Sequence, residues 1–134
     1  MNKISEQPEN LKTFINPAGF IEQHYEGRQT AESVAEGVKQ IQRCAQQLKQ
    51  QKKPILILVD LTKTDTSDIT PSNDAPRKAA VEAIRSISYT RIALYGALPA
   101  QVVINTLALV AGKHHKTKAF NNRFEAVKWL KAKN

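Results

Sequence analysis

Ile55-Leu56-Ile57-Leu58-Val59 is the stretch that decides the fold of this chain. The run is too short for a globular helix, and its isoleucines and valine favour a strand that is buried on both faces. Pro54 precedes the run and separates it from the helical pattern before it, and Asp60 follows it. A strand of this kind is typical of the centre of a partly parallel sheet.

On the N-terminal side of this strand the sequence predicts a hairpin and a helix. Two short segments at 11–14 and 20–25 flank Asn16-Pro17-Ala18-Gly19, whose proline and glycine suit a turn between antiparallel strands. Thr30 can cap a helix that runs to about Gln50. The apolar residues of that helix recur at helical spacing and form one stripe: Val34, Val38, Ile41, Ala45 and Leu48.

On the C-terminal side, helices and strands alternate. The predicted elements are a polar loop at 60–74, a helix at 75–87, a strand at 91–95, a helix at 99–111, a strand at 117–120 and a helix at 123–131. The last helix is expected to turn Phe124, Val127 and Leu130 inward. The order ββαβαβαβα predicts a single α/β domain over 10–134, with a mixed, mostly parallel sheet of four or five strands and about four helices.

Length and composition set further limits. The chain has 134 residues, and 41% of them are hydrophobic, which is enough for one domain with its own core. Its single cysteine, Cys44, excludes an internal disulfide and is expected to be a buried core thiol. Residues 1–9 are polar, lack the apolar region of a secretory signal and are expected to be flexible. Because no run of about 18 apolar residues predicts a membrane span, we expect a soluble cytoplasmic protein.

Four segments, taken in order, carry a resemblance to a known family. The central strand ends in an aspartate, in Leu58-Val59-Asp60-Leu61-Thr62, and a helix follows a polar loop. Arg91-Ile92-Ala93-Leu94-Tyr95-Gly96 leads into an apolar helix, and the chain closes on Phe120 and Phe124-Glu125-Ala126-Val127-Lys128-Trp129-Leu130. Over residues 11–131 this resembles the STAS superfamily, above all its stand-alone bacterial STAS/SEC14-like (SpoIIAA-like) branch. The resemblance implies a mixed sheet with helices packed on it, and a non-enzymatic switch or interaction module.

The same resemblance directs attention to one serine. Anti-sigma-factor antagonists of this superfamily carry Asp-Ser-Ser-Gly at the start of the second helix, and the second serine is phosphorylated. The matching stretch here is Asp65-Thr66-Ser67-Asp68, which makes Ser67 the candidate phosphoacceptor. Asp68 replaces the glycine, Pro71 and Pro76 move the helix start downstream, and the acidic neighbours would repel a phosphate. These departures favour a solvated loop, with a phosphoserine switch at Ser67 as the alternative.

The loop after the central strand is also a candidate ligand site. In open α/β sheets, ligands favour the edge at which the parallel strands end. The polar residues of this candidate ligand loop are Asp60, Thr62, Asp65, Thr66, Ser67 and Asp68. The spacing of its aspartates is not that of a calcium loop, so no metal site is expected, and turn formation and helix capping explain the same residues.

The predicted helix at 99–111 is apolar nearly all round. Its candidate interaction residues, with the residue just before it, are Leu98, Val102, Val103, Leu107 and Val110. A helix of this kind must be covered on more than one side, by its own core, by a second subunit or by lipid. The basic turn Lys113-His114-His115-Lys116 follows directly, and peripheral membrane helices combine the same two features.

The formal net charge of +8 is unevenly distributed. The first 90 residues hold 12 Lys and Arg against 11 Asp and Glu, whereas residues 91–134 hold eight against one. Such an excess can mark an acidic partner, nucleic acid or an anionic membrane, but charge alone argues first for solubility, so a lysine-rich solvated surface is the favoured interpretation. Nucleic-acid binding is not favoured, because the basic residues lack interleaved aromatic ones.

No pattern in the sequence indicates catalysis. There is no Ser/His/Asp or Cys/His arrangement and no glycine-rich phosphate loop. His114 and His115 are adjacent and would not share a metal easily, and His24 is far away in sequence, so no cofactor is expected. We expect a non-catalytic STAS/SEC14-like binding or regulatory module, homodimeric, that contacts another protein or a small apolar ligand. The alternative is a peripheral membrane or anionic-lipid binding protein that uses the 99–111 helix and the C-terminal lysines, and an enzyme of unknown class comes third.

Overall fold

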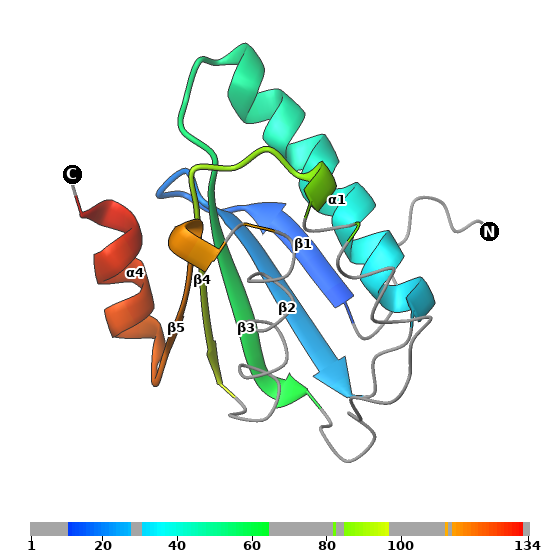
Figure 1. The fold of residues 1–134 in the computed structure, drawn as a ribbon, viewed down its shortest axis with the longest axis vertical. Coiled ribbons are helices and arrows are strands. Elements are labelled where there is room, and N and C mark those ends of the chain that lie inside the picture. Colours follow the sequence, from blue (N-terminus) through cyan, green and yellow to red (C-terminus); the bar gives the residue numbers. More distant parts are fainter. Residues whose placement is uncertain are drawn as a thin grey trace.

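A single five-stranded sheet organises the chain (Figure 1). The computed structural model describes residues 11–27, 31–64, 82, 85–96, 112 and 114–132. The strands are β1 (Leu11–Ile15), β2 (Ile21–Gly27), β3 (Leu56–Thr64), β4 (Arg91–Gly96) and β5 (Thr117–Phe120), and they lie in the sheet in that order. β1 and β2 are antiparallel and every other neighbouring pair is parallel, so the predicted mixed, mostly parallel sheet is confirmed.

The predicted hairpin joins β1 to β2. The backbone N–H of Asn16 donates to the carbonyl of Phe20 at 2.8 Å, and that of Gly19 donates to the carbonyl of Asn16 at 2.9 Å. Gly19 has a φ of +92°, a conformation that glycine adopts without strain. β1 extends one residue beyond its predicted end because Ile15 still pairs with Ile21, and β2 continues to Gly27 because its last residues pair with β3.

The central strand β3 is buried on both faces, as its apolar run predicts. Ile57, Val59 and Leu61 belong to one core cluster, whereas Leu58 belongs to a second cluster on the opposite face of the sheet. The strand continues to Thr64, beyond the predicted end at residue 59. Asp60 and Thr62 therefore lie in the strand and not in a loop, because the parallel pairing with β2 continues past the end of the apolar run.

One helix packs on each face of the sheet among the described residues. Helix α1 (Ala31–Gln50) packs against β1 and β2, and helix α4 (Arg123–Lys131) packs against β3, β4 and β5 on the other face (Figure 1). The α1 interface contains Ile41 and Leu48, together with the partly buried Cys44, so this thiol is less enclosed than predicted. A short 3-10 helix, η1 (His114–Lys116), precedes β5.

An arginine ties each end of α4 to the sheet. Arg123, its first residue, binds Glu22 of β2, as described below. At the other end, Arg91 Nη1 donates to the carbonyls of Trp129 at 2.6 Å and Ala132 at 2.9 Å. These carbonyls belong to the last turn, where a helix has acceptors without intrahelical partners.

The rotation of α4 about its axis differs from the prediction. Its buried residues are Ala126 and Leu130, with Val127 and Trp129 packed partly against the same cluster. Phe124, which was expected to face inward, is 76% exposed. The ion pair with Glu22 directs the Arg123 side chain toward the sheet. Phe124 is the next residue of the helix and therefore points about 100° away from Arg123.

The remaining predicted helices lie largely outside the described residues. In the predicted 75–87 helix, Glu82, Arg85 and Ser86 are helical, whereas Ile87 follows the helix and packs into the first core cluster. The predicted 99–111 helix and the N-terminal segment 1–9 lie outside the described residues. No helix in the part of the chain that the structure describes is long and apolar enough to cross a membrane.

Candidate functional site

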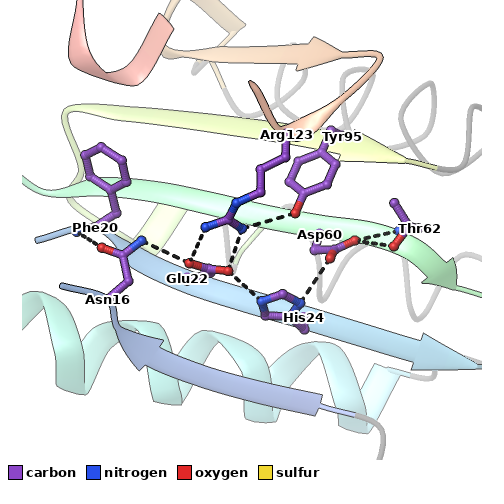
Figure 2. Close-up of polar contacts among 8 residues, drawn as sticks. All are labelled: Asn16, Phe20, Glu22, His24, Asp60, Thr62, Tyr95 and Arg123. Atoms are coloured by element: carbon purple, nitrogen blue, oxygen red, sulfur yellow. Dashed lines mark hydrogen bonds and ion pairs between the residues drawn. The ribbon is translucent and has the colours of Figure 1, made fainter. Parts of the chain in front are cut away.

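A cluster of charged and polar side chains lies on the α4 face of the sheet. Glu22 and His24 come from β2, Asp60 from β3, Tyr95 from β4 and Arg123 from the start of α4 (Figure 2). The strand register places His24 opposite Asp60, and Asp60 opposite Tyr95. The sheet therefore aligns three of these residues in one row, and α4 supplies the cation above it.

Glu22 is the centre of this cluster and its side chain is only 6% exposed. Arg123 binds it with two parallel contacts, Nη1 to Oε2 at 2.6 Å and Nη2 to Oε1 at 3.0 Å. Asn16 Nδ2 donates to Oε1 at 2.9 Å, and the Asn16 side chain is itself held by the backbone N–H of Phe20. The hydrogen bonds from Arg123 outweigh the effect of burial and, with those from Asn16 and His24, lower the pKa of Glu22 to about 2.

His24 lies between two carboxylates. Its Nε2 is 2.7 Å from Glu22 Oε2, and its Nδ1 is 3.0 Å from Asp60 Oδ2. The ring also stacks on Phe14 with 5.9 Å between centroids and 8° between planes. Both nitrogens of His24 are therefore engaged within the protein.

Asp60 and Tyr95 complete the cluster. The Asp60 Oδ1 atom accepts hydrogen bonds from the backbone N–H and the hydroxyl of Thr62, at 2.8 and 2.6 Å. Burial alone would raise the pKa of Asp60, but the bonds from Thr62, the charge of His24 and the Tyr95 hydroxyl lower it on balance. Arg123 Nη1 lies 3.3 Å from the Tyr95 hydroxyl, whose pKa is raised mainly by burial.

A small hollow of about 170 Å³ adjoins this cluster, lined by His24, Tyr25, Glu26, Asp60 and Lys63. Among the described residues, no group of three or more His, Cys, Asp or Glu side chains could hold a metal ion. A general base needs an accessible atom with which to take up a proton. His24 and Glu22 direct their nitrogens and oxygens at each other and at their other partners in the cluster, so the arrangement favours a structural role.

The structure brings together few of the residues that the sequence suggested. Asp60 and Thr62 of the candidate ligand loop bind each other in β3. The rest of that loop, with Ser67 as the candidate phosphoacceptor, lies outside the described residues, as do the candidate interaction helix and Lys113. The residues outside are Asp65, Thr66, Ser67, Asp68, Leu98, Val102, Val103, Leu107, Val110 and Lys113.

The candidate basic turn is partly tied to the core. His114, His115 and Lys116 form η1, and Lys116 Nζ lies 3.3 Å from the carbonyl of Tyr89 and 5.9 Å from the centre of its ring. Lys116 is half-buried as a result. This lysine therefore contributes less to a free basic surface than the sequence suggested.

The sequence interpretation missed Glu22, His24 and Arg123, and it treated Asn16 only as a turn residue. One signal was available in the sequence of β2. Glu22, His24 and Glu26 occupy alternate positions, and alternate residues of a regular strand point to the same face of the sheet. That pattern indicates a polar strand face, but it does not indicate the partner. Arg123 lies 101 residues away from Glu22 in the chain.

Comparison with known proteins supports the fold. No protein-family model and no curated protein matches the sequence. A solved structure does match, that of an uncharacterised protein of the DUF3478 family from Shewanella loihica with a SpoIIAA-like fold. The two share 16% sequence identity and a TM-score of 0.60, over 96% of this chain and 99% of that one.

The fold is SpoIIAA-like. The expected SpoIIAA-like architecture is thus confirmed as a fold, with five strands and the two helices α1 and α4 among the described residues. At 16% identity the likeness does not extend to function. The charged cluster of this SpoIIAA-like domain has to be interpreted from its own contacts.

The depressed pKa of Glu22 predicts that the domain loses stability in acid. The ordinary value is 4.5 and the value in the fold is about 2, so the ionised carboxylate stabilises the fold above pH 4.5. This contribution disappears as the pH falls from 4.5 through 2, since the unfolded chain takes up the proton first. The shift corresponds to about 3 kcal/mol, which we reduce to about 2 kcal/mol because Arg123 is half exposed.

Urea unfolding at about pH 6 and about pH 3 measures this effect. The wild type is expected to lose about 1 kcal/mol more than the Glu22→Gln variant, which cannot titrate at this position, because Glu22 is still largely ionised in the fold at pH 3. Equal losses in the two proteins would show that Glu22 is not held ionised by its partners.

Proposed function

We propose that this SpoIIAA-like domain is a non-catalytic binding module that acts by contact with another protein, in the first place with a second copy of itself. The observation that carries the proposal is the mutual satisfaction of its ionisable groups. Glu22 accepts from Arg123 and Asn16, and His24 faces a carboxylate at each ring nitrogen. Groups arranged in this way hold elements together, whereas a reacting group needs an atom that substrate can reach.

The second copy is favoured by the sequence of the 98–110 stretch. Its apolar residues leave little polar face, and a helix of that composition needs a cover on more than one side. In an isologous dimer the same helix of a second copy provides such a cover, so no other kind of partner is needed. The proposed interface contains Val103 and Leu107, which we choose for the test.

Light scattering coupled to size-exclusion chromatography tests the dimer. The wild type is expected to have twice the mass of the 15.0 kDa chain. Val103→Asp and Leu107→Asp, which place a charge in the interface, are expected to give the monomer mass with an unchanged circular dichroism spectrum. Phe124→Asp, at an exposed position of α4, is the control and should remain dimeric. A wild-type monomer, or Asp variants that remain dimeric, would contradict the proposal.

A small apolar ligand is the second candidate, and one feature of the structure favours it. A hollow of about 370 Å³ lies between the end of α4 and the sheet, within the size range of ligand pockets. Its apolar lining includes Phe20, Leu56 and Leu130. Fluorescence titration with an environment-sensitive apolar dye tests it, since Leu56→Asp, at a partly buried position of the lining, should abolish dye binding. Equal binding by the wild type and this variant would exclude the hollow.

A further inference from the structure

Two exposed aromatic residues are neighbours of residues of the charged cluster, one in space and one along the chain. Phe14 is 43% exposed and Phe124 is 76% exposed, and they are the exposed large hydrophobic side chains of the described part of the chain. Phe14 lies opposite Glu22 in the β1–β2 pair and stacks on His24. Phe124 follows Arg123, which binds Glu22. Phe14 therefore contacts the charged cluster directly, and Phe124 is the chain neighbour of the arginine that binds its central carboxylate.

No described element covers this part of the sheet. Helix α4 packs on β3, β4 and β5, and α1 packs on β1 and β2 from the opposite face (Figure 1). The half of the α4 face that β1 and β2 form thus remains open within the described ranges. Figure 2 shows Glu22 and His24 along this part of β2, with Arg123 directed toward them from α4.

The charges around the two rings are mainly basic. Lys12 is exposed and lies opposite His24 in the β1–β2 register, so it points to the same face as Phe14. Lys128 and Lys131 are exposed on α4, four and seven residues after Phe124, and share its stripe of the helix surface. Of the carboxylates nearby, Glu22 is bound by Arg123 and Asp60 faces His24, whereas Glu125 is exposed on α4 among the lysines.

We propose that this surface, formed by Lys12, Phe14, Phe124, Lys128 and Lys131, docks an acidic segment of another protein that carries apolar side chains. The lysines would bind the acidic residues and the two rings would act as apolar anchors. Exposed aromatic side chains surrounded by charged groups are the usual composition of a binding hot spot and its rim. This surface consists of other residues than the proposed dimer interface and extends the proposed function to a different partner.

A membrane is disfavoured as the occupant because of the way α4 is buried. Helices that lie on membranes insert a broad apolar face between the lipids. The apolar residues Ala126, Val127 and Leu130 of α4 already pack against the sheet, which leaves Phe124 among the lysines. Helix α4 thus has no apolar face left to insert between lipids, whereas separate exposed rings can each be enclosed by a protein pocket.

Binding of a random copolymer of glutamate and tyrosine, measured by fluorescence anisotropy on the full chain, tests the proposal. The Phe14→Ala/Phe124→Ala variant and the Lys128→Glu/Lys131→Glu variant are each expected to bind at least about tenfold more weakly than the wild type. The control is Lys39→Glu/Lys49→Glu, which makes the same charge change on exposed positions of α1 and should bind like the wild type. Leu107→Asp, the dimer variant, should also bind like the wild type.

Three outcomes would overturn the proposal. The first is wild-type affinity in the double aromatic variant, and the second is equal weakening by the α1 control. The third is binding to phosphatidylglycerol vesicles, but not to the copolymer, that depends on Phe124. Thermal melting of each variant checks that it is folded. If the double aromatic variant unfolds, Phe124→Ala alone serves as the test, because so exposed a ring contributes little to stability.

Discussion

Replacing Gly96 with alanine is expected to destabilise the domain by about 3–4 kcal/mol. Gly96 ends β4 with a φ of +118° and lies opposite Leu61 of β3. A Cβ atom there would lie against the backbone nitrogen of Thr62 and 2.6 Å from the carbonyl carbon of Leu61. Because these are backbone atoms of the central strand, no side-chain rotation relieves the clash, and β3 and β4 would have to separate.

The matched control is Gly19→Ala in the β1–β2 turn. Gly19 also has a positive φ, +92°, but a Cβ there meets no atom within 4 Å. The control therefore carries only the conformational strain of a left-handed residue, about 1 kcal/mol. Urea unfolding followed by circular dichroism measures both variants. Equal costs at the two glycines would mean that β3 and β4 do not approach each other as closely as described.

The Arg123→Ala variant is expected to lose about 2–3 kcal/mol of stability. The Glu22 side chain is only 6% exposed. Without the two hydrogen bonds from Arg123, this nearly buried carboxylate keeps only Asn16 and His24 as partners. The estimate is below that for a completely buried pair because the Arg123 side chain is 47% exposed. The start of α4 would lose its link to β2 at the same time.

Two further variants show whether the geometry of Arg123 matters. Arg123→Lys keeps the positive charge but lacks the planar guanidinium that binds both oxygens of Glu22. This variant is therefore expected to lose about half as much stability as Arg123→Ala. Lys128→Ala removes an exposed cation from the same helix and should change stability by less than about 0.5 kcal/mol. A loss in Lys128→Ala as large as that in Arg123→Ala would point to general charge effects and not to the specific pair.

The sequence predicted the sheet well because the signals for its strands are local. The apolar run at 55–59 and the turn at Asn16-Pro17-Ala18-Gly19 each depend on a few neighbouring residues. The predicted end of β3 was wrong. The last residues of this strand are polar, and they are held in the sheet by pairing with β2, as in Lys63 opposite Glu26. Polarity along one segment does not reveal hydrogen bonds that a distant strand supplies.

The charged cluster could not be predicted for the same physical reason. Glu22 and Arg123 meet only once the strand order is set and α4 is placed across β3 and β4. Helical spacing suggested that Phe124 faces inward, but the ion pair of Arg123 sets the rotation of this short helix. Only the alternation of titratable residues along β2 was visible beforehand.

Our central proposal is that Glu22 and Arg123 hold α4 on the sheet and are not reactive groups. A double-mutant cycle with Glu22→Gln, Arg123→Ala and the double variant, measured by urea unfolding near neutral pH, tests this most directly. The two residues are expected to stabilise each other by about 1–2 kcal/mol. Groups kept for chemistry commonly reduce stability, so their replacement tends to stabilise a protein. A coupling energy near zero, or variants more stable than the wild type, would contradict the structural role of this pair.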